Sequence, residues 1–103
     1  MNNYQTANFV DNHWLKEGSG QFLSVKQKYH GKEIGKIPQA SEEQMERAII
    51  AAQDAFDITR KWSSGERSEM MAKLHAKLEE QKDRFINLII DEGGKPRPYA
   101  EAE

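Results

Sequence analysis

The chain has 103 residues, carries 15 Lys and Arg against 17 Asp and Glu, and contains no cysteine. The lack of cysteine excludes disulfides, zinc thiolate sites, iron–sulfur clusters and a cysteine nucleophile within these residues. A formal net charge of -2 excludes the strongly basic surface typical of nucleic-acid binding. The length predicts one domain at most, with a thin core, because only 37% of the residues are hydrophobic.

The sequence indicates no targeting or membrane segment. Residues 1–5 lack the basic and apolar regions of a secretory signal. The longest uninterrupted apolar run, residues 48–52, is far too short to cross a bilayer. We therefore expect a cytoplasmic protein that neither spans a membrane nor binds nucleic acid.

The beginning of the chain predicts a frayed tail followed by a tight turn. Residues 1–8 are polar and without periodicity, which indicates a frayed start. Asp11 and Asn12 are turn-forming residues, and short apolar pairs flank them on both sides. We expect two very short extended segments there, and residues 9–37 as a whole are expected to form strands and hairpins.

A second, longer hairpin is predicted to follow. Residues 22–29 alternate with a period of two, and one face is more apolar than the other. The turn is expected at residues 30–32, where Gly31 can adopt the positive φ that short hairpin loops need. Gly35 indicates a bulge or a close approach of the backbone. Pro38 ends the return strand because it has no N–H for the ladder.

A first helix is predicted over residues 41–61. Ser41 and Gln44 have the spacing of a capping box, with two acidic residues between them at the positive end of the helix dipole. An apolar stripe with helical spacing follows, and it consists of Met45, Ala48, Ile49, Ala52, Ala55 and Phe56. The stripe is rich in alanine, so this helix can lie close to its partner.

A second helical region is predicted over residues 64–92. Ser63 and Glu66 form another capping-box pattern. The apolar pattern weakens over residues 79–84, so the region forms either one long helix or two helices with a break near Gln81. After the weak stretch the apolar face widens and needs cover on more than one side; it includes Phe85, Ile86, Leu88, Ile89 and Ile90.

The end of the chain predicts a helix stop and a new start. Gly93 and Gly94 are typical of the end of a helix, and Pro96 prevents its continuation. Pro98 fits the first position of a third helix over residues 97–103. An isolated helix of about one turn is not stable, so we expect that the sequence is cut short. The predicted fold class is α+β, with an N-terminal antiparallel β-hairpin followed by two or three amphipathic helices.

The residues themselves nominate no catalytic, cofactor-binding or metal site. His13, His30 and His75 lie in three different predicted elements without metal-ligand spacing. The acid pairs fall in polar stretches or at helix starts, where solvation keeps both carboxylates charged; they are Glu42 with Glu43, Glu79 with Glu80, and Asp91 with Glu92. The sequence Gly93-Gly94-Lys95 lacks the spacing of a phosphate-binding loop and follows a helix where that loop follows a strand.

Six segments, in the same order along residues 9–103, resemble the N-terminal region of the aldehyde dehydrogenase superfamily. They are FVDNHW from Phe9, GKEIGKIP from Gly31, ASEE from Ala40, AAQDAF from Ala51, Trp62 with Glu66-Arg67, and DEGGKP from Asp91 with Ala100 and Glu103. Residues 26–30 depart from the family's pattern because they lack its Asn-Pro pair before the glycine. The hairpin tip is therefore expected to differ in shape.

The resemblance implies a fold and a function. Members of this family are longer enzymes of α/β fold that oxidise aldehydes to acids with NAD or NADP, using a Cys nucleophile and a Glu-activated water. The whole of residues 1–103 would then be a single N-terminal fragment of such an oxidoreductase. The family's catalytic and cofactor-binding residues lie beyond the matched stretch, so no residue of this chain takes either role.

Two hypotheses follow. In the first, the chain is an inactive fragment that binds no cofactor, its partner is the remainder of the dehydrogenase polypeptide, and NAD or NADP serves the parent enzyme. In the second, it is a stand-alone protein-interaction or assembly module without enzymatic activity. Missing parts would normally cover two apolar helix faces, so self-association through these faces or local disorder is expected of the isolated chain. One face carries Ala48, Ala52 and Phe56, and the other carries Ile86 and Ile90.

Overall fold

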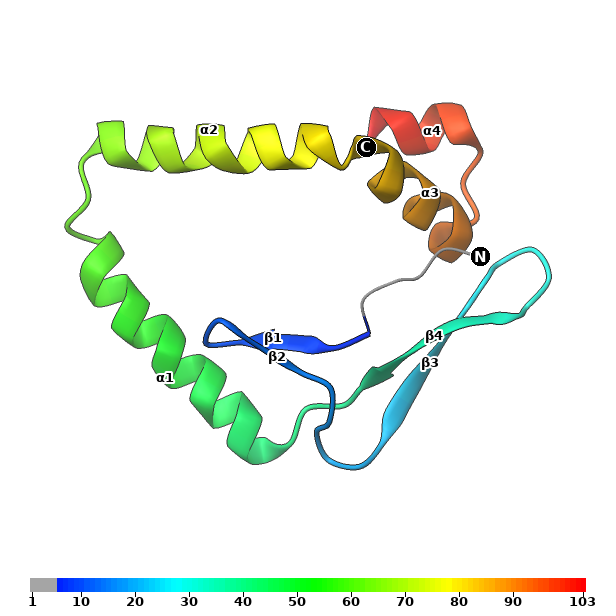
Figure 1. The fold of residues 1–103 in the computed structure, drawn as a ribbon, viewed down its shortest axis with the longest axis horizontal. Coiled ribbons are helices and arrows are strands. Elements are labelled where there is room, and N and C mark those ends of the chain that lie inside the picture. The colour runs from blue at the N-terminus through cyan, green and yellow to red at the C-terminus, as the bar shows by residue number, and fades with distance from the viewer. Residues whose placement is uncertain (1–5) are drawn as a thin grey trace. The chain divides into compact units, whose positions relative to one another are not determined.

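The computed structural model describes residues 6–103 and contains, within them, two antiparallel hairpins and four helices (Figure 1). The α+β class predicted from the sequence is confirmed. The described chain divides into two compact units. The first comprises residues 6–26 and 32–60, and the second comprises residues 27–31 and 61–103.

The first hairpin closes through a tight turn. Strand β1 (Asn8–Val10) pairs antiparallel with β2 (His13–Leu15). Between them Asp11 has a φ of 49° and Asn12 a φ of 62°. Two successive residues with positive φ are typical of the two-residue hairpin turn whose twist matches that of the strands. The turn predicted at these two residues is confirmed.

The start of this hairpin corrects the expected frayed tail of residues 1–8. Residues 1–5 lie outside the described part of the chain. Asn8, however, belongs to β1 and pairs with Leu15. Its side-chain Nδ2 also donates a hydrogen bond of 2.8 Å to the carbonyl oxygen of Pro38. Ladder pairing and this side-chain bond together hold Asn8 in place, which the polar character of the segment did not reveal.

The second hairpin is shorter on its first strand than the alternation predicted. Strand β3 (Phe22–Lys26) pairs with β4 (Glu33–Pro38), so the extension of the strand to Tyr29 was wrong. The side chain of Gln27 accepts hydrogen bonds from the backbone N–H groups of Tyr29 at 2.7 Å and His30 at 3.1 Å. These local bonds offer the backbone an alternative to the ladder and end the strand early.

Two glycines shape this hairpin as expected. Gly31 has a φ of 68° in the turn. The register shifts between Val25 and Lys26, beside the point where Val25 pairs with Gly35. A Cβ atom on Gly35 would lie 3.1 Å from the Cγ2 of Thr6. Gly35 therefore combines the irregular register and the close approach that the sequence predicted there.

Helix α1 (Glu42–Thr59) begins at a complete capping box. The Ser41 Oγ accepts from the N–H of Gln44 at 3.2 Å, and the Gln44 side chain accepts from the N–H of Ser41 at 3.1 Å. Ser41 is therefore the cap that precedes the helix. None of the residues of α1 is buried, and Ile49 and Phe56 are 63% and 62% exposed. The apolar stripe therefore lies on a helix as predicted, but its large side chains Ile49 and Phe56 remain exposed.

The second helical region consists of two helices. Helix α2 (Ser64–Glu80) starts with a capping box formed by Ser63 and Glu66, and no residue of α2 is buried. Helix α3 (Lys82–Gly93) follows directly. At Gln81 φ is -107° and ψ is 16°, outside the helical range. The break therefore falls in the polar stretch, at Gln81, and of the two predicted alternatives the structure has two helices. Among residues 6–103 no helix has the length and apolar character needed to cross a bilayer.

The end of α3 and the start of α4 (Arg97–Ala102) follow the glycine and proline signals with one difference. Gly94 caps α3 with a left-handed φ of 71°, as expected for a terminal glycine. Pro96 precedes α4, whose first residue is Arg97, so Pro98 occupies the second position and not the first. Proline is tolerated there because the N–H groups of the first helical turn have no acceptor within the helix.

The buried apolar side chains of the second unit lie where α3 packs on α4. Ile86 is 5% exposed and Ala100 is 2% exposed, and the two helices are in contact. The expectation of an uncovered face at Ile86 and Ile90 was therefore wrong, since Ile86 is buried and Ile90 is half-buried. The short helix α4 supplies cover that its length alone did not suggest.

Candidate functional site

The three histidines lie at three separate places in the fold. His13 is in β2, with its Nδ1 2.6 Å from the carbonyl oxygen of Asp11 and 3.5 Å from Nη2 of Arg47. His30 lies in the tip of the second hairpin, and His75 lies exposed on α2. Within the described part of the chain, no group of three His, Cys, Asp or Glu side chains is placed to hold a metal ion.

A small charged cluster joins α1 to the first hairpin. Arg47 Nη2 lies 3.7 Å from Asp11 Oδ2, and the two side chains are 47% and 51% exposed. An ion pair so exposed contributes at most about 1 kcal/mol to stability. The cluster links the turn of the hairpin to the helix through exposed side chains. No pattern in the sequence linked these two residues.

The acidic and glycine-rich motifs serve the local structure. Glu42 and Glu43 lie in the first turn of α1, where negative charge is favourable at the helix dipole. Lys95, which follows the two glycines, forms an ion pair with Glu103. The lysine charge is thus directed to a carboxylate of this chain, and Gly93-Gly94-Lys95 stands at the end of a helix as the sequence predicted.

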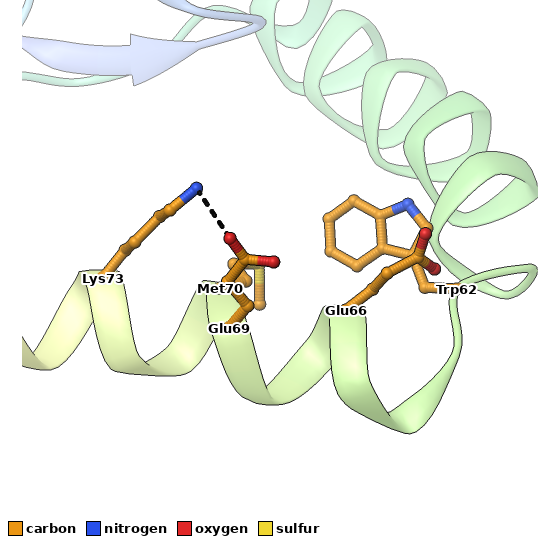
Figure 2. Close-up of a pocket in the computed structure, with 5 residues that line it drawn as sticks. All are labelled: Trp62, Glu66, Glu69, Met70 and Lys73. Carbon is orange, nitrogen blue, oxygen red and sulfur yellow. Dashed lines mark ion pairs between the residues drawn. The ribbon is translucent and has the colours of Figure 1, made fainter.

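One open depression lies at the start of α2 (Figure 2). It has a volume of about 290 Å³ and is lined by Trp62, Glu66, Glu69, Met70 and Lys73. Figure 2 shows the indole ring beside the carboxylate of Glu66, with the other three side chains further along the helix. An apolar ring and thioether are therefore bordered by three charged groups.

The charged groups of this depression already have partners. Glu66 accepts the backbone N–H of Ser63 at 2.7 Å as part of the capping box. Glu69 and Lys73 form an ion pair of 3.6 Å one helical turn apart, with side chains 70% and 74% exposed. None of the lining residues is a serine, threonine or cysteine nucleophile. The depression can contact another molecule, and its charged groups are engaged in local contacts of α2.

No residue of this depression was predicted from the sequence to form a site. Trp62 and Glu66 were noted for the family resemblance and the capping box. Met70 falls in the apolar pattern predicted for the second helical region. Glu69 and Lys73 carried only the spacing of an ordinary helix surface, in which residues three and four apart are neighbours. That spacing could have indicated a shared face but no function.

Comparison with known proteins identifies the sequence pattern. The profile of the aldehyde dehydrogenase family matches residues 14–103. A 3-sulfolactaldehyde dehydrogenase from Pseudomonas putida is 32% identical over 95 residues, which cover 92% of this chain and 20% of that protein. A D-glyceraldehyde dehydrogenase (NADP(+)) from Thermoplasma acidophilum is 31% identical, with coverage of 95% and 20%.

Solved structures agree in fold. An NADP-dependent glyceraldehyde-3-phosphate dehydrogenase from Bacillus halodurans, solved with NADP, matches with a TM-score of 0.89 at 27% identity, over 97% of this chain and 21% of that one. An NAD-dependent benzaldehyde dehydrogenase from Corynebacterium glutamicum matches with a TM-score of 0.86 at 24% identity, over 94% and 21%. The chain thus spans about a fifth of the length of these relatives, as the coverage of 20% and 21% states.

Proposed function

The chain belongs to the aldehyde dehydrogenase family, and we propose that it is the N-terminal supporting segment of an enzyme that oxidises an aldehyde to an acid with NAD or NADP. The observation that carries the proposal is the family match over residues 14–103. The chain covers only 20% of the length of a related 3-sulfolactaldehyde dehydrogenase. A segment of that size supplies structural elements to an enzyme whose chemistry lies elsewhere.

The proposal that the catalytic residues lie outside this chain rests on its amino-acid composition. The family's mechanism needs a cysteine nucleophile, and these 103 residues contain none. The depression beside Trp62 has no nucleophile either. We therefore propose that this chain alone neither oxidises aldehydes nor binds NAD or NADP. In the whole enzyme NAD or NADP would supply the hydride acceptor, and this chain would contribute packing surface.

The partner surface is proposed to be the uncovered apolar face of α1. Its stripe residues Ile49 and Phe56 are 63% and 62% exposed, although large apolar side chains gain free energy on burial. The remainder of the dehydrogenase polypeptide would cover them. In its absence we expect copies of this chain to associate through the same face.

An activity assay with a binding control tests this proposal. The purified chain is mixed with NAD or NADP and a panel of aldehydes, and the absorbance of the reduced cofactor is followed. Thermal unfolding with and without each cofactor reports binding, because a ligand that binds the folded state raises the melting temperature. We expect neither turnover nor a shift. Aldehyde-dependent reduction of either cofactor would overturn the proposal.

The second candidate function is a stand-alone interaction or assembly module without enzymatic activity. The observation that favours it is the complete lack of buried residues in α1 and α2, which leaves two amphipathic helices available to a separate protein. The two candidates differ in the reading frame after the codon for Glu103. The dehydrogenase proposal requires that frame to continue into a cofactor-binding domain.

A cytoplasmic location is part of the same proposal. It rests on the proposed use of NAD or NADP, which cells hold mainly in internal compartments. Fractionation of cells, followed by detection of the protein, tests it; recovery in the secreted or membrane fraction would contradict it.

A further inference from the structure

The tip of the second hairpin, residues 27–31, is held in shape by its own hydrogen bonds (the cyan loop in Figure 1). The N–H of Gly31 donates to the carbonyl oxygen of Gln27 at 2.9 Å. The side chain of Gln27 accepts from the N–H groups of Tyr29 and His30 at 2.7 and 3.1 Å. Local bonds of this kind fix the conformation of a turn. The tip therefore has a defined conformation, in which the N–H of Lys28 and the hydroxyl of Tyr29 are not used by the turn itself.

This tip contacts the C-terminal end of α3 within the second unit. The backbone N–H of Lys28 donates to the carbonyl oxygen of Asp91 at 3.3 Å. The hydroxyl of Tyr29 donates to the carbonyl oxygen of Gly94 at 3.1 Å, across 65 residues of sequence. The last carbonyl groups of a helix have no donor within the helix. The hairpin tip supplies a donor to one of these groups, the carbonyl of Asp91, and a second donor to the carbonyl of Gly94, which caps the helix.

Gly94 permits this contact for two independent reasons. Its φ of 71° lies in the left-handed region, which a residue with a Cβ atom adopts only at a cost. A Cβ atom at this position would also lie 2.8 Å from the Cβ of Lys28. A side chain at Gly94 would therefore displace the hairpin tip as well as strain the end of α3.

We propose that the hairpin tip is a strap that holds the end of α3 and the turn leading into α4, with Tyr29 as the positioning residue that fastens it. The tip is the part of the hairpin in which residues 26–30 depart from the family's pattern, and the departing residues Lys28 and Tyr29 supply both donors. Order in the tip and order at the end of α3 are then coupled, so that loosening one loosens the other.

Amide hydrogen exchange of the full 103-residue chain, measured by NMR, tests the strap. In Tyr29→Phe only the hydroxyl is lost, and we expect the amides of Lys28 and Gly94 to exchange roughly two- to tenfold faster, as the loss of one hydrogen bond predicts. The amides of α1 should be unaffected. Tyr99→Phe is the matched control, because both tyrosines are 68% exposed and no hydrogen bond of the Tyr99 hydroxyl is found within residues 6–103; it should change neither amide.

The reciprocal variant Gly94→Ala tests the coupling from the other side. We expect faster exchange of the Tyr29 and Gly31 amides in the tip, although the substitution lies in the helix end. A cross-relaxation signal between the Tyr29 ring and the Gly94 Cα protons is expected in the unmodified chain. The strap is overturned if that signal is absent, if Tyr29→Phe leaves the Gly94 amide unchanged, or if Tyr99→Phe has the same effect. None of these measurements uses enzymatic activity, so their outcome is independent of the proposed function.

Discussion

Helices α1 and α3 differ in how they begin and in how well they are covered. Helix α1 starts with a complete capping box at Ser41 and Gln44, yet none of its residues is buried. Helix α3 starts at Gln81 without a side-chain cap bond, yet it buries Ile86 to 5% exposure. A well-formed helix start and tertiary cover are therefore set independently in this chain.

The difference follows from what each feature depends on. A capping box needs two side chains three residues apart, so it forms wherever the chain can turn into a helix. Cover needs a second element at packing distance, which α4 supplies to α3. Helix α1 contacts β1, but this short strand leaves none of the residues of α1 buried. This is what we expect of a segment whose partner surface belongs to the rest of a dehydrogenase.

The largest expected effect is a loss of stability at Ile86, the buried side chain of α3. Ile86→Ala should lower the free energy of unfolding of the α3–α4 pair by about 2–5 kcal/mol, because it removes a buried side chain and leaves a cavity. Ile49→Ala is the matched control, because the same chemical change falls on a side chain that is 63% exposed. Denaturant unfolding followed by circular dichroism measures both. Equal losses in the two variants would contradict the difference in cover.

The second effect is on self-association through the exposed apolar face of α1. Phe56→Glu should weaken self-association of the chain tenfold or more, since burial of a phenylalanine contributes about 1.5–3 kcal/mol. Gln53→Glu, on the same helix but outside the apolar stripe, makes the same change of charge and should leave association nearly unchanged. Sedimentation over a range of concentrations gives the association constants. A strictly monomeric unmodified chain would show that the α1 face does not drive association.

A smaller effect is expected at the helix starts. Ser41→Ala and Ser63→Ala should each lower the stability of their helix by about 1 kcal/mol, because each removes an acceptor for a first-turn N–H group. Gln81→Ala should change the start of α3 much less, since its side chain makes no cap bond. Helix content by circular dichroism and local amide exchange report the three variants. A loss at Gln81 as large as that at Ser63 would refute the assignment of the caps.

The smallest effect is expected at the ion pair of the open depression. Glu69→Gln and Lys73→Gln should each change the free energy of unfolding by less than about 0.5 kcal/mol, because both side chains are more than two-thirds exposed, at 70% and 74%. Repeating the unfolding measurement in high salt gives the screening dependence. A loss above 1 kcal/mol would mean that the depression is more enclosed than the structure shows.

The features that the sequence predicted correctly depend on short stretches of chain. Both capping boxes, the turn at Asp11 and Asn12 and the helix end at Gly94 are each determined by residues within about four positions. The break at Gln81 could be placed, because the polar stretch interrupts the apolar pattern, but it could not be distinguished from a continuous helix. In the open depression, the sequence predicted the capping role of Glu66 and the apolar helical position of Met70, but it did not predict that the lining residues form a site.

The features that the sequence did not predict depend on distant residues. The contact of Arg47 with Asp11 and that of Tyr29 with Gly94 join parts of the chain that no local pattern relates. The early end of β3 at Lys26 depends on a side chain of the turn competing with the ladder. The cover of Ile86 depends on a helix of six residues that would not be stable alone.

Sequencing the gene beyond the codon for Glu103 tests the central claim most directly. We predict an open reading frame of several hundred further codons that encodes a cofactor-binding domain and the family's cysteine and glutamate. A natural stop codon at that position, with no such domain encoded, would contradict the dehydrogenase proposal and favour the stand-alone module.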